Sequence, residues 1–252
     1  MLAADIMNGV GRAMKSAAAP LDALEKYFSL KAFEIGSSEG TLHDLYALRY
    51  QVYCLECEFL SAADYPSGLE CDEVDHRSAH FAALNADNVV IGTARLVFPE
   101  PGEPFPYEAH CPPHSDFERP PVMEAVEVSR LAVSRQYRRR AGDTRDGVNA
   151  EALENGNDDT RFRNQRVNGP LLVLGLYREM YRFSRKNNIR YWYAAMERSL
   201  ARVLAMYGFV FTAIGDEHDY YGPVTPYIGD LRKLEDQLRA TSPELLEWFI
   251  NG

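Results

Sequence analysis

The chain has 252 residues, of which 46% are apolar and 25% charged. This composition is typical of a globular protein whose core is large enough to fold without disulfide or metal staples. A net charge of -10 argues against wholesale nucleic-acid binding, which requires a positive face. No uninterrupted apolar run is long enough to span a membrane, and charged residues interrupt the N-terminal segment, so we expect a cytoplasmic protein.

The N-terminal half predicts a helical extension, a strand, a helix and a hairpin. Residues 3–28 are weakly amphipathic, 32–36 read as a short strand, and apolar residues recur at helical spacing over 41–53. An irregular acidic segment follows at 56–77. Residues 79–84 and 88–98 are rich in Ala, Val and Ile on either side of a short polar turn, which is the pattern of a β-hairpin.

The C-terminal half begins with a proline-rich loop over 99–121 and alternates strands with helices after it. The predicted elements are a central strand at 124–134, a basic loop at 135–140, a polar insertion at 141–167, a buried helix at 170–186, a strand at 189–196, a helix at 199–207, a strand at 209–214 and a helical tail at 231–249. This order indicates a layered α/β or α+β fold. We divide the chain into an N-terminal helical extension (1–30), a main domain (31–230, with the insertion 141–167) and a C-terminal helical tail (231–252).

The four cysteines do not indicate a metal site. Cys54 and Cys57 form a C-x-x-C pair, but a structural zinc site needs a second such pair, and the sequence has none. We therefore expect reduced cysteines in packed positions, and no metal. Neither Cys54 nor Cys71 has a histidine placed by a motif to activate it as a nucleophile.

The junction between the central strand and the buried helix has the features of an anion site. Asn168-Gly169-Pro170 predicts a helix N-terminus, whose free N–H groups and dipole attract anions. Arg135, Gln136, Arg138, Arg139 and Arg140 supply donors and cations nearby. This combination suits a pyrophosphate or a phosphopantetheine arm; the alternative is that the arginine run is only a solvated loop.

This junction resembles the GNAT superfamily of acyltransferases, which carries an arginine- or glutamine-led, glycine-bearing loop between its fourth strand and the next helix. The matching residues here are Gln136, Arg138, Arg139, Arg140 and Gly142, with Gly169 beyond the insertion. The resemblance implies that these residues, together with Leu131 and Val133 on the preceding strand, bind the thioester donor. The segment from Leu204 to Phe209 is similar to the GNAT helix whose tyrosine lies near the carrier sulfur, so Tyr207 is the expected proton donor to the departing thiolate.

An ordered set of charged motifs narrows the resemblance. Arg49 stands in Leu-Arg-Tyr-Gln-Val-Tyr, and it is followed by residues 70–75 (Glu-Cys-Asp-Glu-Val-Asp), 92–96 (Gly-Thr-Ala-Arg-Leu) and 127–130 (Glu-Val-Ser-Arg). The set resembles acyl-homoserine-lactone (autoinducer) synthases and long-chain N-acyl amino acid synthases, and overall most closely the acyltransferases associated with PEP-CTERM/exosortase systems. It implies a three-layer α-β-α fold with a mixed, mostly antiparallel central sheet flanked by helices.

The same motifs supply the candidate catalytic and acceptor-binding residues. Glu127 lies on the central strand, where a carboxylate can take a proton from an attacking ammonium. If that strand bulges, amide N–H groups near residues 128–132 can stabilise the tetrahedral oxyanion. Arg49 is the third candidate catalytic residue, and the acceptor-binding set is Asp72, Asp75, Arg95, Ser129 and Arg130. The alternative for each charged member is a purely structural ion network.

The resemblance implies transfer of a long acyl chain from acyl-carrier protein or acyl-CoA, a co-substrate and not a tightly bound cofactor, to the amine of an amino acid. The cations concentrated between Arg135 and Lys186 suit an acidic carrier protein or the phosphates of coenzyme A equally well. We expect no integral membrane span, and peripheral membrane contact through the lipid product stays open. Four alternatives stay open: an autoinducer synthase, an acetyl-CoA enzyme acting on a small amine, a non-catalytic carrier-binding module, and a nucleic-acid binder.

Overall fold

The computed structural model of the protein describes residues 28–34, 40–138 and 160–251, with the backbone alone for Thr41 and residues 160–170. Its elements, in chain order, are β1 (Ser29–Phe33), α3 (Gly40–Tyr50), β2 (Ser78–Leu84), β3 (Val90–Val97), β4 (Ala125–Val133), α5 (Thr160–Lys186), β5 (Tyr191–Met196), α6 (Arg198–Met206), β6 (Phe211–Ala213), β7 (His218–Asp219), β8 (Pro223–Asp230), α7 (Leu231–Thr241) and α8 (Pro243–Asn251).

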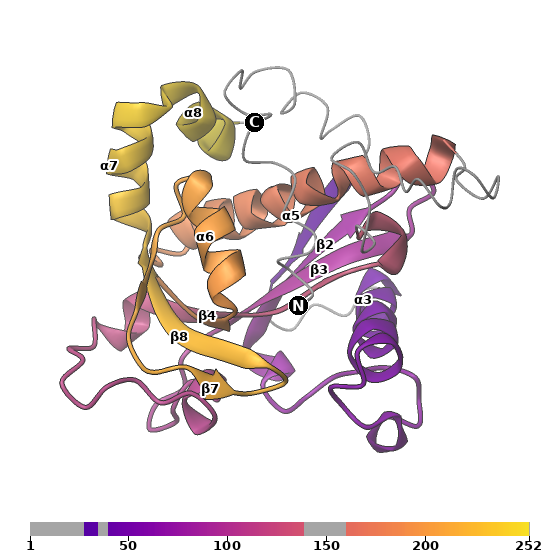
Figure 1. Cartoon of the computed structure of the whole chain (residues 1–252), viewed down its shortest axis with the longest axis horizontal. Helices are drawn as coiled ribbons and strands as arrows, with labels where there is room; N and C mark the ends of the chain where they lie inside the picture. Colours follow the sequence, from indigo (N-terminus) through magenta and orange to yellow (C-terminus); the bar gives the residue numbers. More distant parts are fainter. Residues whose placement is uncertain (1–27, 35–39, 139–159, 252) are drawn as a thin grey trace.

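The strands form a mixed, mostly antiparallel sheet, as the resemblance implied. Its order is β1-β2-β3-β4-β5-β8-β6, and β7 pairs with β8 (Figure 1). The β4–β5 pair is parallel, and the other pairs are antiparallel. A parallel pair needs a crossover connection, and among the described residues α5 is the α-helix that lies between β4 and β5 in the chain.

Helices cover both faces of the sheet. Along β2, Phe81 packs in the larger core cluster with α5, whereas its neighbour Ala82 packs with Leu45 and Leu48 of α3 on the other face. This alternation follows from the period of two along a strand. The helices α6, α7 and α8 join α5 on its face (Figure 1). The predicted three-layer α-β-α arrangement is therefore confirmed.

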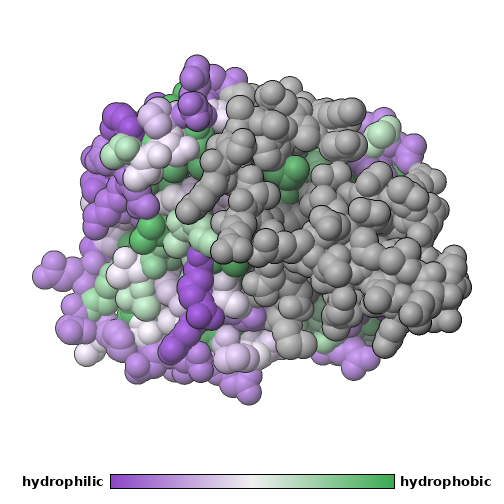
Figure 2. All heavy atoms as spheres, turned by 45° about the horizontal axis from the view of Figure 1, so that its top comes forward, coloured by the Kyte–Doolittle hydropathy of each residue, from purple (hydrophilic) through white to green (hydrophobic). Residues whose placement is uncertain are grey.

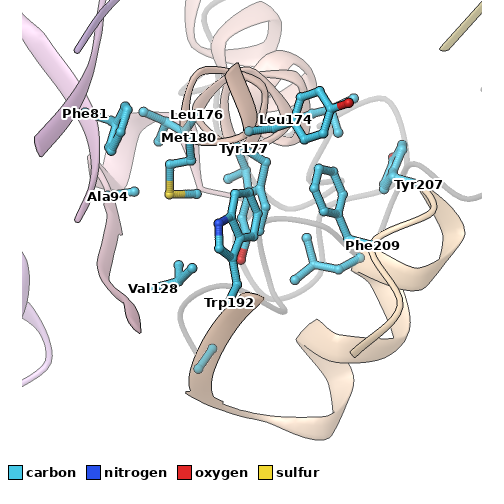
Figure 3. Packing of buried hydrophobic residues seen from close by; sticks show 14 of the residues in the cluster. Phe81, Ala94, Val128, Leu174, Leu176, Tyr177, Met180, Trp192, Tyr207 and Phe209 are labelled. Atoms are coloured by element: carbon cyan, nitrogen blue, oxygen red, sulfur yellow. The ribbon is translucent and has the colours of Figure 1, made fainter. Parts of the chain in front are cut away.

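Aromatic side chains form the centre of the larger core, between α5, β5 and the segment after α6. The rings of Trp192 and Phe209 stack with centroids 5.7 Å apart, and Tyr177 of α5 contacts both (Figure 3). The Trp192 indole N–H donates to Ser184 Oγ at 2.9 Å, so the one polar atom of that ring is satisfied. Burying each such ring stabilises the fold by roughly 1.5–3 kcal/mol.

Gly208 ends α6 in a conformation that only glycine adopts without strain. Its φ is +88°, and a Cβ built there would lie 2.7 Å from Leu238 Cδ2. We expect Gly208→Ala to lower the free energy of unfolding by about 1–3 kcal/mol, through a left-handed φ and a clash with α7. Urea unfolding measures this loss. Gly102→Ala is the matched control, since its φ is +85° but nothing lies within 4 Å of the added Cβ. Equal losses in the two variants would show that the contact with α7 contributes nothing to the loss at Gly208.

Three element boundaries differ from the prediction. The first strand begins at Ser29, not at residue 32. The buried helix begins at Thr160, so Asn168-Gly169-Pro170 lies inside α5 and is not its start. The predicted insertion is thus shorter, because residues 160–167 are helical and 139–159 lie outside the described residues. A polar helical turn carries no apolar period, so the pattern could not reveal it.

The strand β8 was missed, although it lies between β5 and β6 in the sheet. Pro223, Pro226 and Gly229 break its sequence pattern, and prolines and glycines argue against an interior strand. A Cβ at Gly229 would lie 3.0 Å from the Phe211 ring, so that ring would have to shift to accept any larger residue. The consequence for the site is that β5 is paired on the side away from β4, along its whole length.

The described surface is mostly hydrophilic on the face shown in Figure 2, with apolar residues interspersed. Among the described residues, no helix is both long and apolar enough to cross a membrane.

Candidate active site

The strands β4 and β5 separate in the middle of the sheet. They pair over only three positions, Ala125 with Tyr191, Val126 with Trp192 and Glu127 with Tyr193. Beyond Glu127, β4 continues along β3 and β5 continues along β8. The facing edges of the two strands therefore lose their ladder partners, which leaves peptide groups for a ligand to bond.

A bulge bends β4 just beyond this point. Arg95 of β3 pairs with Ser129, but Thr93 pairs with Ala132, so three steps along β4 match two along β3. Arg130 takes up the extra residue with a φ of +51°, a conformation that is rare for a bulky side chain. The hydroxyl of Tyr53 donates to the Leu131 carbonyl at 3.0 Å. The bulge on which the expected oxyanion site depends is therefore present.

A cavity of about 530 Å³ opens at the separated strands. Its lining includes Val128 and Leu131 from β4 and Ala194 and Met196 from β5. Tyr177 of α5 reaches it from one face of the sheet, and Figure 3 shows that side chain extending from α5 toward the sheet. The cavity is mainly apolar on that side and is lined by carboxylates and arginines on the other. Such a mixed lining suits a ligand that has an apolar chain and a polar head.

Glu127 lies at the point where the strands part, and it lines the cavity. Its side chain is buried, and Oε2 accepts a hydrogen bond of 3.0 Å from the Tyr107 backbone N–H. Burial raises the pKa of Glu127 to about 7, while the Tyr107 N–H and the nearby Arg95 lower it and partly oppose burial. A carboxyl with a pKa near 7 can exchange a proton with an amine at neutral pH.

Three arginines and three carboxylates form a buried network on the α3 face of the sheet. Arg49 of α3 is fully buried and bonds Glu70. It also donates to both carboxylate oxygens of Asp75, at 2.8 and 3.1 Å. Burial would raise the pKa of Asp75, but Arg49 and Arg95 outweigh it and hold the pKa below its ordinary value. The network holds the acidic segment 70–75 against the sheet.

Asp72 connects this network to the cavity. Arg95 Nη1 lies 2.6 Å from Asp72 Oδ1, and Arg130 Nη2 lies 2.8 Å from Asp72 Oδ2. Arg95 Nε also donates to Ser129 Oγ at 3.1 Å. Asp72, Arg95, Ser129 and Arg130 all line the cavity, whereas Arg49 and Asp75 do not. The structure thus divides the predicted set into four residues at the cavity wall and two that support them from behind.

The other predicted residues lie in different places. Tyr207 is buried in the core beside Phe209 (Figure 3) and does not line the cavity, and its hydroxyl has no hydrogen-bond partner among the described residues. Val133 is also fully buried in the core. Gln136 is exposed on a short turn, and the neighbouring Arg138 pairs with Glu56.

The helix N-terminus that we predicted beside the anion loop is not there, because Gly169 lies inside α5. Arg139, Arg140 and Gly142 lie outside the described residues. The basic stretch is also divided: Arg182, Arg185 and Lys186 lie in the last turns of α5 and pair with Glu179, Glu235 and Glu34. A helix of that length separates its two ends by about 40 Å, so these three cations lie far from the N-terminal end of α5.

Sequence reasoning missed two tyrosines of the cavity wall. Tyr177 lies on the buried face of α5, and Tyr107 follows a proline within the loop 99–121. Burial raises the pKa of both phenols above the ordinary value, so both are neutral hydrogen-bond donors. Neither belongs to a motif, and only the fold brings them to Glu127 and the strand gap.

The cysteines show no sign of nucleophilic activation. Burial raises the pKa of Cys54, Cys57, Cys71 and Cys111, which disfavours the reactive thiolate. Among the residues that the structure describes, no group of three or more His, Cys, Asp and Glu side chains is arranged to hold a metal ion.

Comparisons with known proteins agree with this geometry. Residues 48–145 match the family model described as the acetyltransferase (GNAT) domain. No curated protein sequence matches the chain.

Similar solved structures include BjaI, TofI and LasI. The CoA-dependent acyl-homoserine lactone synthase BjaI, solved with SAM and isopentyl-CoA, is 20% identical with a TM-score of 0.58, over 84% of this chain and 89% of BjaI. TofI, solved with an inhibitor and MTA, is 16% identical with a TM-score of 0.56, over 82% and 96%. The AHL synthase LasI is 13% identical with a TM-score of 0.54, over 81% and 90%. The chain therefore has the GNAT-like α/β fold.

Proposed function

We propose that this protein, with its GNAT-like fold, is an N-acyltransferase that moves an acyl group from a thioester donor to the amine of an amino acid. The observation that carries the proposal is the placement of Glu127 at the parting of β4 and β5, on the wall of a cavity that is apolar on one side and charged on the other. The donor is acyl-CoA or acyl-carrier protein, and a long chain is favoured by the resemblance to N-acyl amino acid synthases.

The donor arm is expected to lie between the separated strands. An extended pantetheine carries amide groups that can pair with the peptide groups which β4 and β5 leave unpaired beyond Glu127 and Tyr193. The acyl chain then extends toward Tyr177, Met196 and Leu200, which line the apolar part of the cavity. Amides at the β4 bulge are suitably placed to stabilise the oxyanion of the thioester carbonyl.

The acceptor is expected at the charged side of the cavity. Its ammonium loses a proton to Glu127, and the free amine attacks the thioester carbonyl directly. Arg130 is the candidate partner for the acceptor carboxylate, since its side chain is partly exposed at the wall and Asp72 and Glu70 hold its other donors. Asp75 and Arg49 support this wall from behind, so we assign them positioning roles.

The departing thiolate needs a proton. The sequence resemblance assigns the role of proton donor to Tyr207, but the Tyr207 hydroxyl lies away from the cavity wall. Tyr177 is the phenol that extends from α5 toward the strand gap (Figure 3). We therefore assign to Tyr177 the hydrogen bond that stabilises the departing thiolate, since its raised pKa keeps the phenol protonated at neutral pH. The sulfur receives the proton that the attacking nitrogen loses as it becomes an amide.

An acylation assay tests this function. The protein is incubated with acyl-CoA and with acyl-carrier protein of several chain lengths and with a pool of amino acids, and the products are identified by mass spectrometry. We expect release of the free thiol together with a new N-acyl amino acid. An acyl-homoserine lactone formed from a supplied S-adenosylmethionine would instead indicate an autoinducer synthase. Thioester binding without release of thiol would contradict the proposal and indicate a non-catalytic carrier-binding module.

A further inference from the structure

The loop that covers Glu127 is held by interactions that the proposed mechanism has not used. Within residues 105–119, a single turn from Pro106 to Ala109 places the Tyr107 backbone N–H on Glu127 Oε2. That N–H is the one hydrogen-bond donor to the Glu127 carboxylate among the described residues. Glu127 Oε1 has no such partner there, so one oxygen is held by the loop and the other is left for the cavity.

Glu108 and Arg119 close this loop. Arg119 donates to both carboxylate oxygens of Glu108, at 3.1 and 2.6 Å. Glu108 Oε1 also accepts the Phe105 N–H at 3.1 Å. This fork-to-fork geometry fixes direction as well as distance. The ion pair therefore sets the conformation of residues 105–108, and with it the position of the Tyr107 N–H.

Aromatic packing holds the loop against the sheet. The ring of Tyr107 stacks on Tyr193 with centroids 5.4 Å apart, and Phe105 packs on the same ring at 5.3 Å. Tyr193 is the β5 residue that pairs with Glu127. Packing sets how closely the loop approaches, but rings can slide along one another, so the ion pair is what fixes its register.

We propose that the Glu108–Arg119 ion pair is a positioning device for Glu127, which holds the Tyr107 N–H on one carboxylate oxygen so that the other faces the acceptor amine. This inference rests on the proposed role of Glu127 as the base. Glu108 and Arg119 touch no substrate in this arrangement; they act through the loop.

The charge state of Glu127 is the property that this device controls. The hydrogen bond from the Tyr107 N–H stabilises the ionised form of Glu127 and so lowers its pKa, whereas burial raises that pKa. Loss of this hydrogen bond therefore moves the Glu127 pKa upward. The other titratable and charged groups around Glu127 are Arg95 on β3, Arg130 on β4, Asp72 in the acidic segment, Tyr220 after β7, and Cys111 and the Tyr107 phenol in the loop itself. The first four lie outside the loop that the ion pair closes.

The test measures the titration of Glu127 directly. Protein labelled with carbon-13 at the glutamate carboxyls is titrated by NMR, and the Glu127 resonance is the one that disappears in Glu127→Gln. Arg119→Gln and Glu108→Gln are each expected to move the Glu127 pKa upward by about one unit, the size of one charge-assisted hydrogen bond. The charge-swapped double variant Glu108→Arg/Arg119→Glu restores an ion pair but leaves the Phe105 N–H without its acceptor, so it is expected to recover part of that shift.

Arg239→Gln is the matched control, because it breaks an exposed ion pair with Asp236 on α7; it is expected to leave the Glu127 titration unchanged. In a folded Arg119→Gln protein, an unmoved Glu127 resonance would overturn the proposal, and so would a shift of which the double variant recovers no part. If Arg119→Gln does not fold, Arg119→Lys keeps the charge, loses the fork and is expected to give a smaller upward shift.

Activity gives a second readout that separates this inference from the proposed function. In an active enzyme, the acid limb of the pH profile of kcat is expected to move upward with the Glu127 pKa, while KM for the donor stays within about twofold. If the wild-type protein transfers no acyl group, the proposed function fails, yet the NMR titration still decides whether the ion pair controls Glu127.

Discussion

Glu127→Gln is expected to lower kcat/KM for acyl transfer by about 10²–10⁴-fold, the usual contribution of a general base. Glutamine keeps the shape of the side chain and can still accept the Tyr107 N–H, so binding of the thioester donor is expected to persist. Thiol release and donor affinity, measured on the same preparation, separate the two effects. Glu124→Gln is the control, because Glu124 precedes β4 and does not line the cavity.

Glu127 is also expected to make the free energy of unfolding depend on pH. Burial raises the pKa of Glu127 from 4.5 to about 7, so the folded protein holds this proton more tightly than the unfolded chain. The stabilising contribution is fully present below pH 4.5 and is lost as the pH rises through about 7. At higher pH the loss reaches at most about 3 kcal/mol.

Glu127→Gln removes this dependence because an amide does not titrate. We expect the variant to match the wild type near pH 5 and to exceed its free energy of unfolding near pH 8.5, as measured by urea denaturation. An equal difference at both pH values would show that the Glu127 side chain is not held protonated by the fold. Retained turnover in Glu127→Gln would remove Glu127 from the mechanism, whatever the stability result.

Arg49→Met is expected to destabilise the protein by about 3–5 kcal/mol, because it leaves buried carboxylates without their cation. Glu70 is fully buried, and the Asp75 side chain is 7% exposed. Other arginines contact both groups, but Arg49 is the one that binds the two together. For a chain of this size, the change corresponds to a melting temperature lower by roughly 10 °C.

Two controls separate the effect of unpaired buried charges from the loss of an arginine side chain in general. Arg239→Met removes an exposed arginine that pairs with Asp236, and it is expected to change stability by no more than about 0.5 kcal/mol. The triple variant Arg49→Met/Glu70→Gln/Asp75→Asn leaves no unpaired charge at the site and is expected to recover part of the loss. If Arg49→Met alone melts like the wild type, the network is not what holds the acidic segment to the sheet.

The sequence motifs predicted the charged residues at the wall of the cavity, because each motif is a short segment that can be recognised without knowing the fold. Arg49, Arg95 and Arg130 carry charges at positions that also read as helix or strand, whereas Asp72 and Asp75 lie in the irregular acidic segment. Charges at such positions need partners once buried. The strand alternation around Glu127 and the hairpin of residues 78–97 are equally local patterns. For these residues, chemistry and periodicity predicted both the fold class and the presence of an ion network.

Pattern and motif did not locate the side chains whose position depends on distant segments. Tyr207 satisfies a local helical pattern, yet the packing of α6 on α7 and α5 directs it into the core. Tyr177 has the same pattern, and it reaches the cavity because α5 crosses the face of the sheet where β4 and β5 part. The Tyr107 N–H carries no signal at all in the sequence, since any residue but proline can supply a backbone donor.

The sequence alone determined the layered fold, the central strand with its carboxylate, and the charged residues that must pair. Only the tertiary structure decided which of them face the cavity, since β8 occupies the far edge of β5, β4 bulges at Arg130, and the two strands separate beyond Glu127. The physical reason is that strand pairing and burial are settled between residues far apart in the chain, whereas side-chain chemistry and periodicity are properties of neighbours.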